Sequence, residues 1–439
     1  MKRLLIALLS LGLIAVFNTA ALAVDLKFSG EFYAAGIYLD KTSLQKDTAT
    51  SGPSAAFYFQ RLRVRTDFVV TPGITLVTRF DAMERAWGAA RSTPGTTLAL
   101  DSAGTAAENE NIAFDWAYIN YMSPVGMFDV GIMNYGSTGT IFGNNSAPQG
   151  RIKYSYTIGP ATINAALSKV KDKSYSAVTA TSTTADADND VYHLEGIYKW
   201  KDGMAGLNVN YYRTAENRQA SNYKTTYFLF TPYTMAKIGP VALQAELNYA
   251  NGKTREYDNG AGDIKMENWS GWIDATATFG PIYFGGTFAY VSGDDPNTTD
   301  KQEGGTINGG RDWNPCLILF NYYDRTYWIG ALAGNGTSTN SGPMSNAWFY
   351  QGRLGVKPTD KLDIVASLSY SNADKKPTGY VSDTYGYEVD VTGTYKITNN
   401  LSYMLGVGYL ITGDYFKGAS AASAISNDYM VINKLTLTF

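Results

Sequence analysis

The sequence YMVINKLTLTF, from Tyr429 to Phe439, alternates between two kinds of side chain. One set of alternate positions is mainly apolar, is interrupted by Asn433, and comprises Tyr429, Val431, Leu435, Leu437 and Phe439. The other set includes Lys434, Thr436 and Thr438. A period of two residues is typical of a β-strand whose two faces meet different surroundings. The stretch therefore predicts a strand with one apolar and one polar face.

The same alternation recurs along the chain. It is clear in the segments 62–70, 241–249, 362–370, 385–397 and 401–411. In a closed barrel that spans a membrane, the apolar face of each strand points to lipid and the polar face points to the lumen. Aromatic residues gather near several strand ends, where such a barrel has its interfacial girdles. We therefore predict an all-β fold, a transmembrane antiparallel β-barrel.

The connections between the predicted strands are alternately short and long. Tight-turn signals, rich in Gly, Pro, Asp and Asn, occur at 71–73, 123–126, 159–160, 201–203, 239–240, 280–281, 358–360 and 398–400. Longer polar segments lie near 40–55, 88–110, 136–150, 171–189, 215–222, 251–263, 293–345, 372–379 and 413–427. An outer-membrane barrel sorts its connections in this way, with short periplasmic turns and long extracellular loops.

Counting the alternating segments gives about eighteen strands. Their expected bounds are 25–39, 56–70, 74–87, 111–123, 126–136, 151–158, 161–170, 190–200, 204–214, 223–238, 241–250, 264–279, 281–292, 346–357, 361–371, 380–397, 400–412 and 428–439. An even number allows antiparallel closure. Apolar stretches at 316–320 and 327–332 could form a further hairpin, so sixteen and twenty strands stay open. Pro232 predicts a bulge, because proline interrupts a ladder of hydrogen bonds.

Residues 1–23 are predicted to be a signal peptide. Lys2 and Arg3 precede an apolar run from Leu4 to Phe17, and Ala21-Leu22-Ala23 has the small-x-small pattern of a cleavage site. No later stretch reaches the apolar length of a membrane helix. A chain exported without a helical anchor is either soluble or a closed barrel, since only helices and barrels span lipid. We assign 24–439 to a single barrel domain.

The composition excludes several other classes. The 439 residues include 1 His and 1 Cys, which excludes a Cys/His zinc site, a disulfide framework and an iron–sulfur cluster. The formal net charge of −3 argues against nucleic acid as the main partner. The 33 Tyr and 44 Gly, with only 17% charged residues, do not fit a disordered chain.

With these features the chain resembles Gram-negative outer-membrane porins. The resemblance covers the leader, the alternating strands and the ending Leu435-Thr-Leu-Thr-Phe439, which is similar to the signal read by the barrel-assembly machinery. The segment from Trp116 to Gly131 looks like the fourth and fifth strands of trimeric diffusion porins. Phe28-Ser29-Gly30 and the Arg-Leu-Arg-Val-Arg run look like porins of metal-respiring bacteria.

The resemblance implies a bacterial outer-membrane location and a loop that folds inward to narrow the pore. Here that loop would be 136–150, with Phe142, Asn144 and Asn145 at the constriction. It also implies assembly through Phe439. Eighteen strands match substrate-selective and alginate-export barrels better than the sixteen-stranded general porins. The homotrimer that general porins form therefore stays an open alternative.

Charged residues mark the predicted lumen wall. Arg61, Arg63 and Arg65 share one strand face, and a turn at 71–73 would set Arg65 opposite Arg79 and Arg63 opposite Asp81. Such a cluster is improbable against lipid, where an arginine costs about 2–4 kcal/mol at the midplane. We interpret it as a basic wall that attracts anions. The alternative is a solvated face balanced by Asp67 and Asp81.

Further acidic candidates for the lumen come mostly from late strands: Glu246, Asp274, Asp363, Glu388 and Asp390. Because distance along the sequence becomes distance around a barrel wall, early basic and late acidic residues would face each other across the pore. We therefore hypothesise a transverse electric field that favours dipolar or zwitterionic solutes.

The sequence offers no enzyme site. His193 lies in a predicted strand without a nucleophile placed by spacing, and Cys316 is expected to be a free thiol in the long loop. We expect no cofactor and no metal. The leading function is passive diffusion of small hydrophilic solutes and ions through a water-filled porin. The alternatives are a substrate-selective channel or exporter with 293–345 as a plug, a barrel that sheathes a cytochrome partner, and a soluble secreted β protein.

Overall fold

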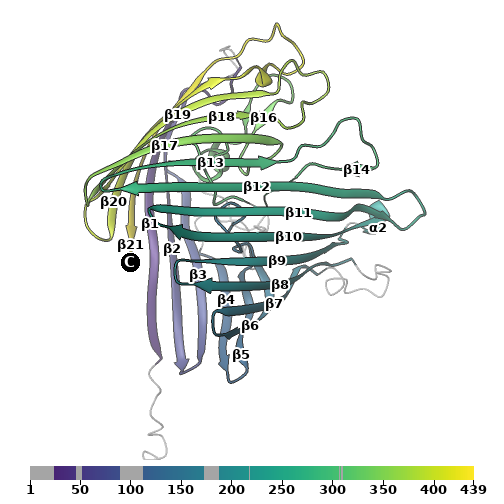
Figure 1. Ribbon diagram of the computed structural model, residues 1–439, viewed down its shortest axis with the longest axis vertical. Coiled ribbons are helices and arrows are strands. Elements are labelled where there is room, and N and C mark those ends of the chain that lie inside the picture. The colour runs from purple at the N-terminus through teal and green to yellow at the C-terminus, as the bar shows by residue number, and fades with distance from the viewer. Residues whose placement is uncertain are drawn as a thin grey trace, which may run out of the picture.

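The computed structural model describes residues 24–45, 52–88, 112–172, 187–216, 218–305, 307 and 310–439. Eighteen long strands form a closed antiparallel barrel (Figure 1). They are β1 (Asp25–Leu39), β2 (Ala55–Thr71), β3 (Ile74–Ala86), β4 (Ala113–Ser123), β5 (Gly126–Asn134), β6 (Pro148–Ile158), β7 (Ala161–Lys171), β8 (Asn189–Trp200), β9 (Gly203–Thr214), β10 (Tyr223–Ile238), β11 (Val241–Tyr257), β12 (Ile264–Phe279), β13 (Ile282–Val291), β17 (Ala347–Thr359), β18 (Leu362–Asn372), β19 (Thr384–Lys396), β20 (Leu401–Thr412) and β21 (Asp428–Thr438).

Each strand pairs with its sequence neighbours, and β1 pairs with β21 to close the ring. The fold class and the expected count of eighteen are thus confirmed. The further hairpin considered in the long connection does not join the wall. There the chain forms a π-helix η1 (Tyr322–Thr326), a short helix α3 (Tyr327–Ile329) and a small pair, β15 (Leu332–Ala333) and β16 (Thr339–Asn340). The strand β14 (Lys301–Gln302) adds to β12 in parallel.

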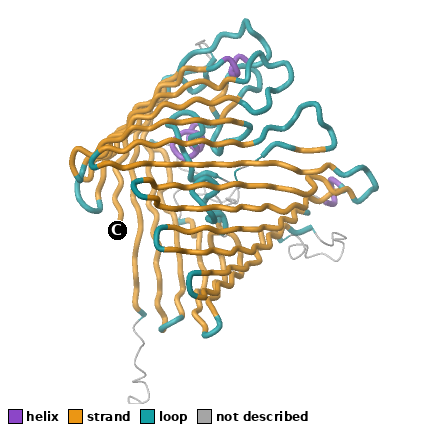
Figure 2. The backbone as a smooth tube through the Cα atoms, in the orientation of Figure 1, coloured by secondary structure: helices purple, strands orange, loops and turns teal. Residues whose placement is uncertain are grey.

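Short and long connections lie at opposite ends of the barrel, as the loop pattern predicted (Figure 2). Three of the tight turns use a Gly-Pro pair, at Gly159, Gly239 and Gly280. Their φ angles of 56°, 60° and 57° lie in the left-handed region that favours glycine. The longer connections also carry α2 (Arg218–Ser221) and a 3-10 helix η2 (Asp414–Lys417).

The outer surface of the barrel is apolar. On β20 the outward side chains Tyr403, Leu405, Val407, Tyr409 and Ile411 are all exposed, as an apolar band in contact with lipid would be. Aromatic rings lie at both edges of this band. Tyr370 on β18 packs on Tyr387 near the long loops, and Phe279 stacks on Phe284 at a tight turn. These rings occupy the positions of two interfacial girdles.

Two strands depart from the expected pattern. The two faces of β4 do not alternate strictly, because β4 carries a register shift opposite Arg79 and Phe80. At this bulge Trp116 lines a lumen cavity, and the adjacent Asp115 accepts a hydrogen bond from Arg79 of the same cavity. The prediction of a bulge at Pro232 was wrong. The β10–β11 register is the same on either side of Pro232, and the shift lies between Lys224 and Thr226 instead.

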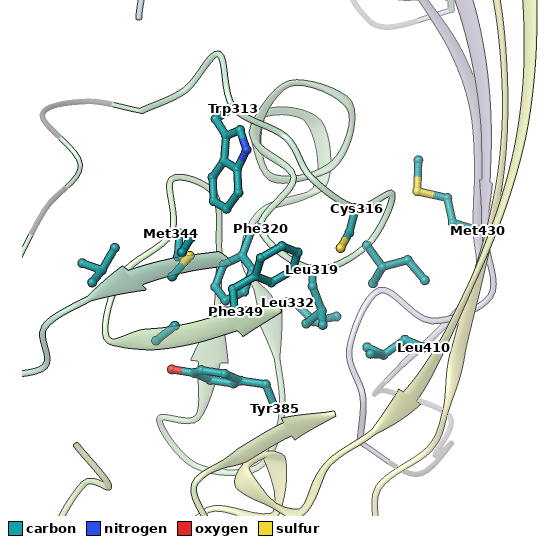
Figure 3. Packing of buried hydrophobic residues seen from close by; sticks show 14 of the residues in the cluster. Trp313, Cys316, Leu319, Phe320, Leu332, Met344, Phe349, Tyr385, Leu410 and Met430 are labelled. Carbon is teal, nitrogen blue, oxygen red and sulfur yellow. The ribbon is translucent and has the colours of Figure 1, made fainter. Parts of the chain in front are cut away.

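The interior of the barrel holds an apolar core on one side. Near the long loops, inward residues such as Phe349, Tyr385, Leu410 and Met430 are buried. They pack against residues of the long connection between β13 and β17, including Trp313, Phe320 and Leu332 (Figure 3). We call residues 310–345 of this connection the plug. Its core keeps it inside the barrel.

The predicted signal peptide, residues 1–23, lies outside the described residues. Among the residues that are described, no helix has both the length and the apolar character needed to cross a membrane.

Candidate functional site

A polar cavity of about 390 Å³ lies between the barrel wall and two segments inside the barrel, the β5–β6 connection and the plug. We call it the eyelet. The wall supplies Glu31, Tyr33, Arg61, Arg63, Arg79, Trp116, Asn134 and Lys434. The chain inside the barrel supplies Ser137, Ser146, Asp312, Tyr323 and Asp324. The eyelet therefore joins one side of the barrel wall, from β21 through β1 to β5, with the two inward segments.

In the basic cluster of the wall, Arg61, Arg63, Arg65 and Arg79 each have an acidic partner. Arg63 donates from Nε and Nη2 to the two carboxylate oxygens of Asp81, both at 2.6 Å. Arg61 pairs with Glu31 at 3.2 Å and with Glu84 at 3.7 Å. The predicted register is confirmed, because Arg63 lies opposite Asp81 and Arg65 lies opposite Arg79. The basic cluster is thus neutralised locally.

Arg79 shows how the bulge of β4 completes the eyelet. Its Nη2 donates to Asp115 at 2.7 Å and to Ser146 at 2.7 Å, and its guanidinium carbon lies 3.7 Å from the centroid of the Trp116 ring. Nη2 therefore bridges the wall and the inward segment. Arg65 lies outside the eyelet, toward the tight turn, and forms a two-bonded pair with Asp67.

The plug supplies the opposite side of the eyelet. Asp324 pairs with Lys434 of β21 at 3.4 Å, and Lys434 lies over the Tyr33 ring at 4.5 Å. The Tyr323 hydroxyl donates to Asp312 at 2.9 Å. Burial, followed by the nearby Asp312 carboxylate, raises the pKa of Tyr323, so the phenol stays protonated. The eyelet thus lies between wall arginines and plug carboxylates.

The connection 135–147 between β5 and β6 reaches across the interior. Glu246 on β11 accepts from the backbone N of Thr140 at 2.7 Å and from its Oγ1 at 2.8 Å. Asn208 on β9 donates to Thr138 at 2.9 Å. Glu246 is only 4% exposed, so this carboxylate lies on the lumen face but is covered by the connection it holds.

Phe142 and Asn144 join this connection to the plug. Phe142 is fully buried, stacks on Trp272 of β12 with ring centroids 5.9 Å apart, and meets the edge of Trp313 at 5.2 Å. The backbone N of Asp312 donates to the Asn144 carbonyl at 3.1 Å. Asn144 and Asn145 are half-buried, whereas Phe142 offers no surface to a solute and anchors the segment instead.

The late acidic candidates lie away from the eyelet. Asp274 on β12 pairs with Arg353 of β17 at 2.6 Å. Glu388 on β19 accepts from the backbone N atoms of Ile318 and Leu319 at 2.6 and 2.7 Å. Glu388 is 0% and Asp390 5% exposed beneath the plug. These residues hold the interior together, and the acidic side chains that face the basic wall come from the plug and from neighbouring strands.

Sequence reasoning missed Trp116, Asp312, Asp324 and Lys434 as parts of one cavity, and Asp115 as the partner of the cavity residue Arg79. The bulge hid Asp115 and Trp116. The positions of Asp312 and Asp324 required the path of the plug, which brings Asp324 to Lys434 of β21. One signal was present in the sequence: strands β20 and β21 carry apolar residues on both faces near the long loops, as at Leu410, Met430 and Ile432. Where the lumen face of a strand is apolar near one end, the pattern predicts that another segment of the chain packs against that end inside the barrel.

No protein-family model and no curated protein matches the chain. Solved structures with the same fold are Pseudomonas aeruginosa OccK2 (OpdF) in complex with glucuronate and a BenF-like porin from Pseudomonas fluorescens. The first has a TM-score of 0.51 at 12% identity and covers 94% of this chain and 97% of its own. The second has a TM-score of 0.50 at 14% identity and covers 94% of this chain and 99% of its own. The chain therefore has the fold of these outer-membrane barrels.

Proposed function

We propose that the protein is an outer-membrane porin, a water-filled channel for passive diffusion of small hydrophilic solutes and ions. The observation that carries this proposal is a polar cavity of about 390 Å³ inside a closed barrel whose outer face is apolar. An apolar band suits the bilayer, and a polar interior suits water and solutes. The fold shared with known porins supports the same function and the bacterial outer-membrane location.

The chemistry of the eyelet is steric and electrostatic. The segment 135–147 narrows the path, with Asn144 and Asn145 as polar edges. Arg61 and Arg63 then face Asp312 and Asp324 of the plug across the cavity. Charged groups around a pore set its ion selectivity. Since the basic residues are paired with acids, the open channel should discriminate only weakly between small anions and cations.

The protein acts without a catalytic step in this proposal. His193 on β8 is buried, and its Nδ1 makes a hydrogen bond of 2.8 Å with Asn210 Oδ1. The Nε2 atom lies 3.9 Å from Glu195. These neighbours are an amide and a carboxylate, which do not make the base–nucleophile pair of a hydrolase.

A second candidate is a substrate-selective channel. The observation that favours it is the plug, whose buried core with Phe349, Tyr385 and Leu410 occupies one side of the interior. A narrower path selects more strongly. OccK2 was solved with glucuronate, and this sugar acid is therefore a suitable probe solute for a chain of the same fold.

Single-channel recording in planar bilayers tests both candidates. A porin should give stable ohmic steps in simple salt. A substrate-selective channel should give small steps that glucuronate blocks or modulates, with a neutral sugar of similar size as the control. Absence of any conductance from a barrel that shows heat-modifiable gel mobility would contradict both.

We also propose that Phe439 takes part in assembly and that a homotrimer is the state to test. The Phe439 ring is 49% exposed at the end of β21, where a recognition factor could reach it. Phe439→Ala should lower the amount of folded barrel in outer membranes, while refolding in detergent stays unchanged. Native mass spectrometry of the detergent-extracted protein would decide between monomer and trimer.

A further inference from the structure

Three side chains with metal-binding atoms converge beneath the plug. One ligand atom each of Cys316, Glu388 and Asp390 lies within 4.8 Å of the others. Cys316 is a buried residue of the plug, and the two carboxylates project from alternate positions of β19. Their exposed fractions are 4%, 0% and 5%. The cluster thus joins a thiol of the plug to two carboxylates of the wall strand β19, about 70 residues later in the chain.

The cluster has unused coordinating capacity. Oδ1 of Asp390 has no hydrogen-bond partner, although the residue is buried. A Cβ built on Gly408 of β20 would lie 2.6 Å from Asp390 Oδ1 and 3.4 Å from Glu388 Oε1, so both oxygens converge above the space that this glycine leaves. Each oxygen of Glu388 accepts one backbone hydrogen bond and retains another lone pair.

The charge balance also favours a cation. Two buried carboxylates side by side repel each other unless a proton or a cation lies between them. Arg325 of η1 is the buried cation of the plug, and its Nη1 donates to the Gly330 carbonyl at 2.9 Å. Burial lowers the pKa of Arg325 to about 10, which leaves it charged at neutral pH. The charge of Arg325 acts on both Asp428 and Glu388, so one buried arginine stands against the three buried carboxylates Glu388, Asp390 and Asp428.

We propose that Cys316, Glu388 and Asp390 bind one divalent cation of the zinc class, which fastens the plug to β19. A thiolate with two carboxylates is a donor set that suits Zn²⁺ or Cd²⁺. Bonds of about 2.0–2.3 Å would draw the three atoms closer together. Ser369 stands beside the site, with its Oγ 3.3 Å from the Cys316 sulfur.

Binding would exchange a proton for the metal. The metal forms a bond to sulfur, and the S–H proton leaves to solvent. Composition excluded a Cys/His site, but it does not exclude one thiol joined with carboxylates by the fold. This site stands independently of the proposed channel activity.

The test uses the full-length mature barrel refolded in detergent, with either Zn²⁺ or a chelator present during refolding. After gel filtration, elemental mass spectrometry should find one zinc per chain in the first sample. Cd²⁺ should give the ultraviolet absorption of a thiolate–cadmium bond. Zinc binding should release a proton from the thiol, measured in weakly buffered solution.

Two variants and a control make the result specific. Cys316→Ser should abolish the cadmium absorption, and Asp390→Asn should weaken zinc binding at least about tenfold. Asp274→Asn changes a lumen carboxylate outside the cluster and should keep one zinc per chain. Heat-modifiable mobility checks that each variant is folded. Folded wild-type barrel without stoichiometric zinc, or with zinc unaffected by both variants, overturns the site whatever the conductance shows.

Discussion

Glu246 on β11 and Thr140 of the β5–β6 connection are joined by two hydrogen bonds, one to the backbone N at 2.7 Å and one to Oγ1 at 2.8 Å. The carboxylate of a wall residue therefore holds the inward segment 135–147 at Thr140. Hydrogen bonds to charged groups contribute about 1.5–3 kcal/mol each, and this pair is buried, where such bonds are strong. This contact holds the segment together with the Asn208–Thr138 hydrogen bond and the packing of Phe142.

We expect Glu246→Ala to release the inward segment. The single-channel conductance should rise and become noisier, because the segment would no longer be fixed across the path. Glu246→Gln is the matched variant, since it keeps one acceptor oxygen, and it should fall between wild type and alanine. Equal conductance and equal noise in all three proteins would show that Glu246 does not control the path.

We expect substitutions of Arg63 and of Asp81 to change the ion selectivity of the channel in opposite directions. Arg63→Ala leaves the Asp81 carboxylate without its two-bonded partner, so the channel should shift toward cation selectivity. Asp81→Asn leaves the guanidinium unbalanced and should shift it toward anions. Reversal potentials in a salt gradient measure both. A shift of the same sign in both variants would contradict the local pairing.

Gly30 should resist substitution. A Cβ at this position would lie 2.4 Å from the Arg63 carbonyl oxygen and 2.6 Å from the Phe439 ring, so Gly30→Ala should lower the temperature at which the gel mobility shifts. Gly393→Ala on β19 is the control, because a Cβ there meets nothing within 4 Å. The control should leave the transition temperature unchanged or raise it slightly. Equal effects at both positions would argue against crowding of Gly30 between β2 and Phe439.

The rate at which Cys316 is labelled shows whether the plug is closed over this thiol. Burial raises the pKa of its thiol, which keeps the fraction of reactive thiolate below that of an ordinary cysteine at any given pH. Maleimide labelling of the folded barrel should therefore be slow at neutral pH and increase only at more alkaline pH. Glu388→Ala removes the acceptor of the Ile318 and Leu319 amides and should accelerate labelling. Rapid labelling of the wild type would show that the plug is open.

The strands were predictable because a barrel wall imposes a period of two on every segment. The register of Arg63 with Asp81 followed from the turn at 71–73. The eyelet was not predictable, since its acidic side comes from Asp312 and Asp324, whose position depends on a long connection without periodic pattern. The hypothesis of an electric field between early and late strands assumed that late carboxylates face the open lumen. Glu388 instead accepts hydrogen bonds from backbone amides of the plug.

The contact between Phe142 and Trp313 has a further consequence. Together with the bond from the Asp312 amide to the Asn144 carbonyl, it makes the inward segment and the plug neighbours that cannot shift separately without breaking contacts. By thermodynamic linkage, if the position of one segment changes the affinity of a ligand for the other, that ligand biases the position of the first segment by the same coupling free energy. A displacement of either segment is therefore opposed by its contacts with the other.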